Sequence, residues 1–507
     1  MPLSILIWLP LFAALVGALV SPRAAARATL VGALGVVGLA IYYIVDFKSG
    51  HAGLQHETNV VWISQLGIHY KLGLDGLNLF LIGLTALLFA AATLAANLRE
   101  WERARLFYFQ LGLAEAAVLG AFCAQDLALF VVFFDLMLVP FYFLIGMWGE
   151  RDRVRATTKL VIYTLVGSLL MLAGAIATAV LATPDGGHLT FELSKLAALP
   201  LSEGSQEWIF LLFAAAFLVK MPAFPLHGWL PDGYRAMPIP VVAVFSGVLS
   251  KVAAYGFLRV VLPLFPGASA HFQTLLLLIA LASILYGSAM AFTQTNLRLI
   301  VGFSSIAQLG FITLGIFSLR PEGAQGAILQ MVNHGLVTAP LFFIIAVLAA
   351  RAGGSEDLRD MGGAALRAPV LAGLFLIVAL ATLAMPGSSN FVGEFLILLG
   401  VFQSKLVIAA VAFTGVALAA VYMLRAFIRT VHNRVGERVQ SRELGLADGL
   451  VIAPLVLAIL ALGLYPQVAL KRSESTVVGS IAAARAAAHP AGAPAPPQAV
   501  GAPQQGA

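Results

Sequence analysis

Apolar stretches long enough to cross a lipid bilayer recur along the whole chain and limit its fold more than any other feature. A hydrocarbon core about 30 Å thick needs roughly 20 apolar residues in a helix, and about fourteen runs satisfy that length. The sequence therefore predicts an all-α polytopic membrane protein of about 14 transmembrane helices. The runs lie near residues 3–21, 28–46, 74–97, 106–124, 126–149, 158–182, 207–230, 238–264, 272–292, 296–318, 325–350, 368–402, 405–429 and 448–466.

The composition excludes a water-soluble globule. Of the 507 residues, 60% are hydrophobic and only 11% are charged, and the mean hydropathy is +0.95. Soluble domains are usually about one quarter charged. A soluble enzyme, a nucleic-acid binder and a disordered scaffold are therefore excluded. Cys123 is the one cysteine, and the sequence has no Cys/His cluster. We therefore expect neither a redox cofactor nor a metal in this chain.

The positive charges predict how the chain is oriented. Nineteen Lys and Arg residues fall in one set of alternate connections and eight in the other. The richer set is expected on the cytoplasmic side, which places both termini on the outer side of a bacterial cytoplasmic membrane. Arg259, at the end of its span, is expected to extend to the membrane interface.

Six ionisable side chains interrupt the apolar spans. Such residues cost roughly 2.5–3.5 kcal/mol each on insertion scales, so they are candidates for function. Carboxylates, lysines and a histidine together can move protons. The alternative is structural, because a buried ion pair or hydrogen bond can also fix helix packing. The candidates are Glu115, Asp135, Lys220, Lys251, His334 and Glu394.

Two of the predicted spans contain prolines that should interrupt them. Met221-Pro222 follows Lys220 directly, and Met385-Pro386-Gly387 precedes Glu394. Paired interrupted spans in corresponding halves of a chain indicate a transport site. Five spans per half would make the halves inverted. We predict N-terminal helices 1–3 in residues 1–105, inverted repeats over 106–264 (helices 4–8) and 272–429 (helices 9–13), a last span with an interfacial segment over 448–487, and a disordered Ala/Pro-rich tail over 488–507.

Five motifs together resemble a known family, the antiporter-like membrane subunits of proton-pumping NADH:quinone oxidoreductase (bacterial respiratory complex I). The KMPAFPLHGWLPDGY motif is shared across the wider family, whereas NFVGEF and LGLYPQ resemble the subunit M (chain 4) type. The resemblance covers about residues 3 to 470. Its motifs lie at Leu72–Leu79, Phe133–Gly149, Lys220–Tyr234, Met385–Phe395 and Leu462–Gln467.

The resemblance implies a proton path. Asp135 and Lys220 would form the ion pair of the first half-channel, Lys251 and His334 a central relay, and Glu394 the outlet. Glu115 matches an acid on the preceding helix. Three positions depart from the family pattern: Asp135 stands for the usual Glu, Gln308 for a frequent His, and Tyr234 for a second His after WLPD. The shorter Asp135 puts its reach to Lys220 in doubt.

The resemblance also implies an assembly. The chain would move protons from the cytoplasm outward, driven by redox chemistry in other subunits that carry FMN, iron–sulfur clusters and quinone. Its partners would be neighbouring antiporter-like subunits and the lipid bilayer, not nucleic acid. The alternatives are a subunit of a multi-subunit sodium/proton antiporter or of a membrane-bound hydrogenase, and a purely structural membrane subunit.

Overall fold

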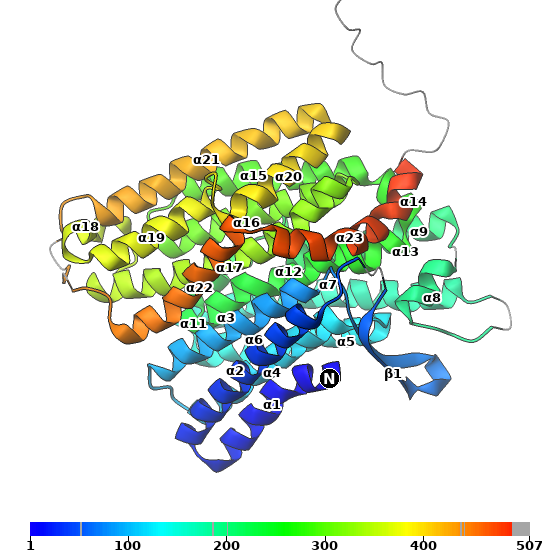
Figure 1. Cartoon of the computed structure of the whole chain (residues 1–507), viewed down its shortest axis with the longest axis horizontal. Helices are drawn as coiled ribbons and strands as arrows, with labels where there is room; N and C mark the ends of the chain where they lie inside the picture. The colour runs from blue at the N-terminus through cyan, green and yellow to red at the C-terminus, as the bar shows by residue number, and fades with distance from the viewer. Residues whose placement is uncertain (51–52, 185–186, 200, 437–438, 441, 489–507) are drawn as a thin grey trace, which may run out of the picture.

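The computed structural model describes residues 1–50, 53–184, 187–199, 201–436, 439–440 and 442–488. Almost all of its regular structure is helical (Figure 1). The exception is an antiparallel hairpin of β1 (Gln55–Ile63) and β2 (Ile68–Leu74) in the connection that follows α2. The helical membrane fold is confirmed, and the hairpin is an addition that the sequence analysis did not predict. The predicted tail over 488–507 lies outside the described residues, apart from residue 488.

The helices fall into an opening group, two halves and a closing pair. The opening group is α1 (Leu3–Val20), α2 (Pro22–Asp46) and α3 (Leu79–Asn97). The first half is α4 (Ala104–Cys123), α5 (Leu127–Leu136), α6 (Leu138–Trp148), α7 (Arg153–Ala182), α8 (Leu193–Ala198), α9 (Glu203–Lys220), α10 (Leu230–Ala236), α11 (Ile239–Val244), η2 (Phe245–Leu249), α12 (Ser250–Gly256), η3 (Phe257–Val261) and α13 (Leu262–Leu264). The second half is α14 (Pro266–His271), α15 (Gln273–Thr293), α16 (Leu297–Phe317), α17 (Pro321–Arg351), η4 (Leu358–Asp360), α18 (Ala364–Arg367), α19 (Pro369–Thr382), α20 (Ser389–Ser404) and α21 (Leu406–Val431). The closing pair is α22 (Leu446–Leu464) and α23 (Gln467–Ala488).

Twelve of the described helical stretches are long and apolar enough to cross a membrane. The other two predicted spans, 207–230 and 368–402, are the interrupted ones. α9 ends at Lys220, just before Pro222, and the chain resumes a helix only at Leu230. The second interruption separates α19, which ends at Thr382, from α20. Because proline lacks an N–H and its ring clashes one turn back, these breaks follow directly from the sequence. Both predicted interruptions are confirmed.

Helix lengths in the two halves match in chain order. α4 has 20 residues and α15 has 21, α7 has 30 and α17 has 31, and the helix from Ile239 to Leu264 and α21 have 26 each. The split helix of α5 and α6 covers 22 residues, and α16 covers 21. This order supports the predicted repeats, whose boundaries stay a prediction.

Each half also contains a short backbone bridge, which we call a latch. In the first latch, the Leu127 N–H donates to the Phe191 carbonyl at 2.7 Å and the Leu193 N–H to Gln125 at 3.1 Å. In the second latch, the Leu297 N–H donates to Glu356 and the Leu358 N–H to Thr295, both at 2.9 Å. The α8 helix follows the first latch and α18 follows the second, and these helices lie at opposite ends of the molecule (Figure 1). Such placement is what an inverted repeat requires.

The core lies in the middle of the second half and at its junction with the first. The apolar windows of α16 and of the helix from Ile239 to Leu264 are completely buried, whereas only a third of the window is buried in α1, α2 and α21. Large apolar side chains remain exposed along α7, among them Ile162, Leu165 and Leu169. This arrangement suits lipid around the protein, because exposed apolar surface on this scale is rare in soluble monomers.

The closing helix α23 packs along the body against α13, α14 and α17 (Figure 1). Thr476 accepts a hydrogen bond from the Gly76 N–H at 3.3 Å, which ties α23 to the turn after β2. The helix of the predicted segment is therefore present, and its position at a membrane interface stays a prediction.

The expected interfacial position of Arg259 is wrong. Its side chain is only 12% exposed, and Nη2 lies 2.5 Å from Asp75 Oδ2. Nε also donates to the Tyr255 hydroxyl at 2.8 Å. A carboxylate 184 residues away in the sequence satisfies this guanidinium inside the protein, so the side chain has no need to reach the interface.

Candidate functional site

The helix from Ile239 to Leu264 carries Lys251 and contains two π-helical stretches, η2 and η3, on either side of it. Such bulges are rare and concentrate at functional sites. Lys251 is fully buried, and its Nζ donates to the Ser246 carbonyl at 2.5 Å. A charged amine with a single backbone acceptor in a buried position is typical of a transport pathway rather than of packing.

Glycines bring this helix against α17 next to His334. A Cβ on Gly335 would lie 2.6 Å from the Gly247 carbonyl oxygen, and a Cβ on Gly247 would lie 2.2 Å from Leu88. Only glycine permits this approach of two backbones. Lys251 is the charged neighbour of His334, and both ring nitrogens of His334 are buried without a hydrogen-bond partner among the described residues. The predicted central pair is therefore brought together.

Lys220 lies at the C-terminal end of α9 and is 3% exposed. Its Nζ donates to the Phe134 carbonyl at 2.5 Å and lies 3.6 Å from the centroid of the Phe134 ring. The last carbonyls of a helix lack an intrahelical partner. The helix that carries Phe134, α5, ends at Leu136. Pro140, in the first turn of α6, has no N–H with which to continue the hydrogen-bond pattern from α5.

Asp135 and Lys220, the predicted ion pair, interact without direct contact. No oxygen of Asp135 lies within 4 Å of the amine in the part of the chain that the structure describes, although the two charges still interact electrostatically. Asp135 Oδ1 is buried without a hydrogen-bond partner. The shorter side chain explains the difference, because Lys220 binds the backbone carbonyl one residue earlier instead.

Glu115 lies in the middle of α4 and is 1% exposed. Its Oε1 has no hydrogen-bond partner among the described residues, and none of the other five predicted residues lies on α4. In the ranges described, Glu115 makes no hydrogen bond or ion pair with any of the other five predicted proton-transfer residues. In this it differs from Lys251 and His334, which are neighbours, and from Asp135, which interacts with Lys220.

Glu394 accepts hydrogen bonds from two glutamines. Gln308 Nε2 donates to Glu394 Oε1 at 2.7 Å, and Gln330 Nε2 donates to Gln308 Oε1 at 2.7 Å and to Glu394 Oε1 at 3.3 Å. All three side chains are at least 97% buried. The predicted outlet is therefore a carboxylate held by amides from α16 and α17. The sequence analysis named Gln308 but missed Gln330, because a single buried amide is indistinguishable from helix packing.

Polar side chains connect these groups. The Tyr234 hydroxyl lies against the side chains of Ser246 and Ser305, so it lies inside the core rather than at the surface. Asn333, next to His334, donates from Nδ2 to the Ser389 carbonyl at the start of α20 at 2.6 Å. Ionisable and polar groups thus extend from the first interruption to the second.

The sequence analysis also missed Arg298, which it counted among the cytoplasmic charges. The side chain is 2% exposed and makes a charged pair with Glu356, in which Nε lies 2.9 Å from Oε1. It also donates to the Met237 carbonyl at 2.7 Å. Arginines at the start of a span usually orient the chain in the membrane. The sequence therefore gives no indication that the side chain of Arg298 is buried.

Among the described residues, no group of three or more His, Cys, Asp or Glu side chains could hold a metal ion. The fold and the site define a polytopic membrane protein with a buried series of ionisable side chains between two interrupted helices. This construction is that of an ion translocator.

Comparison with known proteins identifies the family. The sequence profile described as "NADH:quinone oxidoreductase/Mrp antiporter, TM" matches residues 124–419. NADH-quinone oxidoreductase subunit M of Escherichia coli (strain K12) is 38% identical over 444 residues, covering 86% of this chain and 87% of the relative. Subunit M of Rhodobacter capsulatus is 35% identical over 481 residues, covering 92% and 93%. The chain therefore belongs to the NADH:quinone oxidoreductase/Mrp antiporter membrane family, as its motifs predict.

Solved structures agree with this assignment. A chain of respiratory complex I from Thermus thermophilus superposes with a TM-score of 0.86 at 33% identity, covering 94% of this chain and 99% of that one. A chain of the Mrp complex from Dietzia sp. DQ12-45-1b superposes with a TM-score of 0.82 at 23% identity, covering 96% and 98%. The second similarity concerns the fold alone.

Proposed function

We propose that this chain is the subunit M type of membrane subunit in an NADH:quinone oxidoreductase and that it moves protons across a bacterial cytoplasmic membrane. The observation that carries the proposal is the buried series Lys220, Lys251, His334 and Glu394, which extends from one interrupted helix to the other. The identity of 38% to subunit M of Escherichia coli over most of both chains supports the choice of complex.

In this proposal protons enter near Lys220 from the cytoplasm. The amine gives its proton to Lys251 when its own charge is less stabilised by Asp135, and His334 then carries the proton toward Glu394. Buried polar atoms need hydrogen-bond partners, so water between these groups would conduct the proton. Ser250 Oγ, Asn333 Oδ1 and both His334 nitrogens are buried atoms that such water would satisfy.

The driving energy would come from partner subunits. FMN, iron–sulfur clusters and quinone would be held there, and this chain would contribute no redox centre of its own. Its neighbours would be the other antiporter-like membrane subunits. Both termini would lie on the outer side, because the connections richer in Lys and Arg would face the cytoplasm.

The test is to replace Lys220 in the assembled complex. Lys220→Gln removes the charge while its length stays similar, and the matched control Lys405→Gln changes an exposed lysine at the start of α21. The rate of NADH-driven proton uptake per assembled complex is measured in inverted membrane vesicles, with assembly checked by native electrophoresis. We expect Lys220→Gln to lower proton uptake about tenfold or more and the control to keep it, since a loss of about 1.4 kcal/mol slows a step tenfold.

Two results would contradict the proposal. Unchanged proton uptake per assembled Lys220→Gln complex would make the chain a structural subunit. Sodium-dependent proton exchange by a purified complex that lacks flavin and NADH oxidation would place the chain in a multi-subunit antiporter instead.

A further inference from the structure

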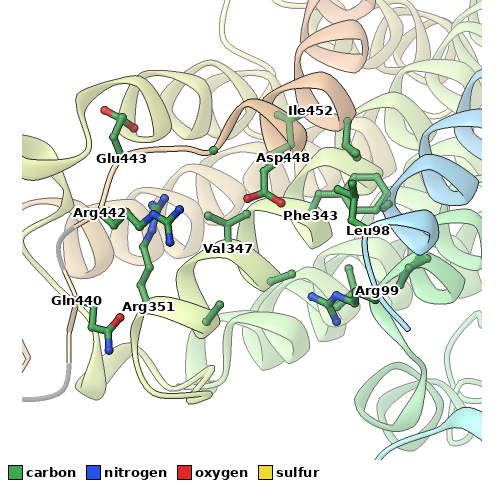
Figure 2. Close-up of a pocket in the computed structure, with 17 residues that line it drawn as sticks. Leu98, Arg99, Phe343, Val347, Arg351, Gln440, Arg442, Glu443, Asp448 and Ile452 are labelled. Atoms are coloured by element: carbon green, nitrogen blue, oxygen red, sulfur yellow. The ribbon is translucent and has the colours of Figure 1, made fainter. Parts of the chain in front are cut away.

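A cavity of about 310 Å³ opens at one end of the helical bundle, and none of the six predicted proton-transfer residues lines it (Figure 2). It lies between the C-terminal ends of α3 and α17 and the N-terminal ends of α11 and α22. The connection before α22 closes one side. Because the ends of apolar spans mark the boundary of the hydrocarbon core, this cavity lies at the depth of lipid headgroups.

Three arginines from three segments line the cavity. Arg99 follows α3, Arg351 ends α17, and Arg442 belongs to the connection before α22. Figure 2 shows the guanidinium groups of Arg351 and Arg442 side by side at the cavity, with Arg99 on the other side of it. Guanidinium groups match phosphate oxygens in geometry and in charge.

Arg351 lacks a partner for a buried donor. Its Nη1 is buried without a hydrogen-bond partner, and no carboxylate lies within 4 Å of the side chain among the described residues. A buried donor of a charged group that lacks an acceptor destabilises the folded protein. An acceptor in the cavity beside it would remove that cost.

The two acids of the cavity, Glu443 and Asp448, offset only part of the charge of the arginines, and they interact with Arg351 electrostatically without a contact ion pair among the described residues. Glu443 accepts hydrogen bonds from the N–H groups of Val370, Leu371 and Leu444, so its carboxylate is occupied at the start of α19. Asp448 lies in the first turn of α22. Three arginines against two carboxylates leave one positive charge, which suits a monoanionic group such as a phosphodiester.

The remaining wall is apolar. Leu98, Phe343, Val347 and Ile452 line it, and they come from the ends of the same spans (Figure 2). Free phosphate would gain nothing from this wall, whereas the glycerol and the first methylenes of acyl chains would bury apolar surface against it. The combination of a cationic cluster with an apolar wall therefore indicates an amphiphile.

We propose that this cavity binds the phosphodiester headgroup of a membrane glycerophospholipid, with the phosphate between Arg351 and Arg442 and the acyl chains along the apolar wall. Arg99 closes the site from the end of α3. The lipid would bridge the ends of α3, α17 and α22, three helices that also pack against one another.

The experiment uses the assembled complex in its own membrane. A phospholipid with a photoreactive diazirine near its glycerol is incorporated, the sample is irradiated, and labelled peptides are identified by mass spectrometry. We expect label on peptides that contain Val347 and Ile452. We expect Arg351→Gln combined with Arg442→Gln to reduce this label about tenfold or more, since each charge-assisted hydrogen bond is lost.

A matched control carries Arg23→Gln and Arg155→Gln, two exposed arginines on α2 and α7 outside the cavity, and it should keep the label. If the double cavity variant fails to assemble, Arg442→Gln alone is used, because that side chain is exposed and its loss leaves α17 intact.

Three results would overturn the proposal. Equal labelling of the cavity variant and the wild type would show that the arginines do not hold the lipid. Displacement of the label by millimolar inorganic phosphate as completely as by unlabelled phospholipid would make this a site for a free anion. Cross-linking of the cavity peptides to a neighbouring subunit in place of the lipid would make it a protein interface.

Discussion

Two acceptors lie near the Lys220 amine at the end of α5, the Phe134 carbonyl and the Asp135 carboxylate. The amine binds the uncharged one. It binds the Phe134 carbonyl and the face of the Phe134 ring, while the adjacent Asp135 carboxylate lies beyond 4 Å. A cation over an aromatic face gains up to about 2 kcal/mol when desolvated. The amine therefore binds a neutral acceptor, while the nearby charged acceptor acts on it only electrostatically.

Asp135→Glu should turn this open arrangement into a contact pair. The additional methylene extends the carboxylate toward the amine, and an ion pair at 4 Å is worth about 4 kcal/mol at an effective dielectric constant near 20. We expect the structure of the variant complex to show the Lys220 amine within 4 Å of the new carboxylate and away from the Phe134 carbonyl. Cryo-electron microscopy of the variant measures both distances.

Asp135→Asn supplies the control for charge. It keeps the volume and removes the carboxylate, so the rate of NADH-driven proton uptake should fall about tenfold if the interaction contributes about 1–2 kcal/mol. A variant that pumps at the rate of the wild type would exclude a switching role for this acid. An Asp135→Glu structure with the amine still on Phe134 would show that the length of the side chain is not the cause.

Among the elements, the contact between η2 and α17 decides whether Lys251 and His334 meet. Gly247 and Gly335 allow the two backbones to approach, and the π-helical stretch places Lys251 one turn from the acceptor of its amine, Ser246. The geometry of the central relay therefore depends on residues that carry no ionisable group.

Gly335→Ala should separate the two helices. Its Cβ would lie 2.6 Å from the Gly247 carbonyl oxygen and 2.7 Å from Leu84, so one element must move. We expect a loss of about 1–3 kcal/mol of stability, as for other overpacked cores, together with slower proton uptake. Thermal inactivation of NADH-driven proton uptake in vesicles measures both effects.

Gly373→Ala on α19 is the matched control. A Cβ there meets nothing within 4 Å, and alanine in a helix is up to about 1 kcal/mol more favourable than glycine. The control should keep both stability and proton uptake. Equal behaviour of the two variants would show that the close approach at Gly335 does not matter.

Much of this element order could be predicted from the sequence, for physical reasons. The span lengths, the interruption after Lys220 and the buried position of Lys251 follow from local rules on apolar runs, on proline and on the cost of charge in a membrane. The hairpin of β1 and β2 could not be predicted from the same rules, since those rules concern membrane spans and not the connections between them.

For the whole molecule, each end carries one latch and one cluster of charges around it. In the first latch, Glu192 pairs with Lys71, at 2.9 Å, and with Lys195. In the second latch, Arg359 holds the pKa of Asp357 at about 2 through its hydrogen bonds. The Lys71–Glu192 and Asp75–Arg259 pairs join residues that are far apart in the sequence, so the sequence analysis could name neither of them.

Glu192 predicts how the first latch responds to acid. Burial raises the pKa of its carboxyl, but hydrogen bonds from Lys195 and Lys71 outweigh burial, so its pKa lies below the ordinary value. A depressed pKa in the folded state contributes stability that is complete above the unfolded pKa of about 4.3 and is lost as the pH falls below it. The protection factors of the Leu127 and Leu193 amides, which are hydrogen–deuterium exchange rates corrected for the intrinsic rate at each pH, should therefore fall as the pH drops below about 4.3.

Glu192→Gln should remove that pH dependence. At pH 7 the variant should open the first latch about 5-fold to 150-fold more often, which corresponds to the loss of about 1–3 kcal/mol. Glu203→Gln, an exposed acid at the start of α9, should behave as the wild type. The same pH profile in the wild type and in Glu192→Gln would assign the acid response to another group.

The hydrogen bond between Thr476 and Gly76 has a consequence for biogenesis. The two residues are 400 positions apart, so ribosomes working at about 5–20 residues per second need roughly 20–80 s to deliver the second after the first. Throughout that interval the turn beside the Asp75–Arg259 pair stays uncovered while every intervening span enters the membrane. The contact between this turn and α23 thus forms late in folding. During translation the turn would be accessible to an insertion chaperone or to a neighbouring subunit.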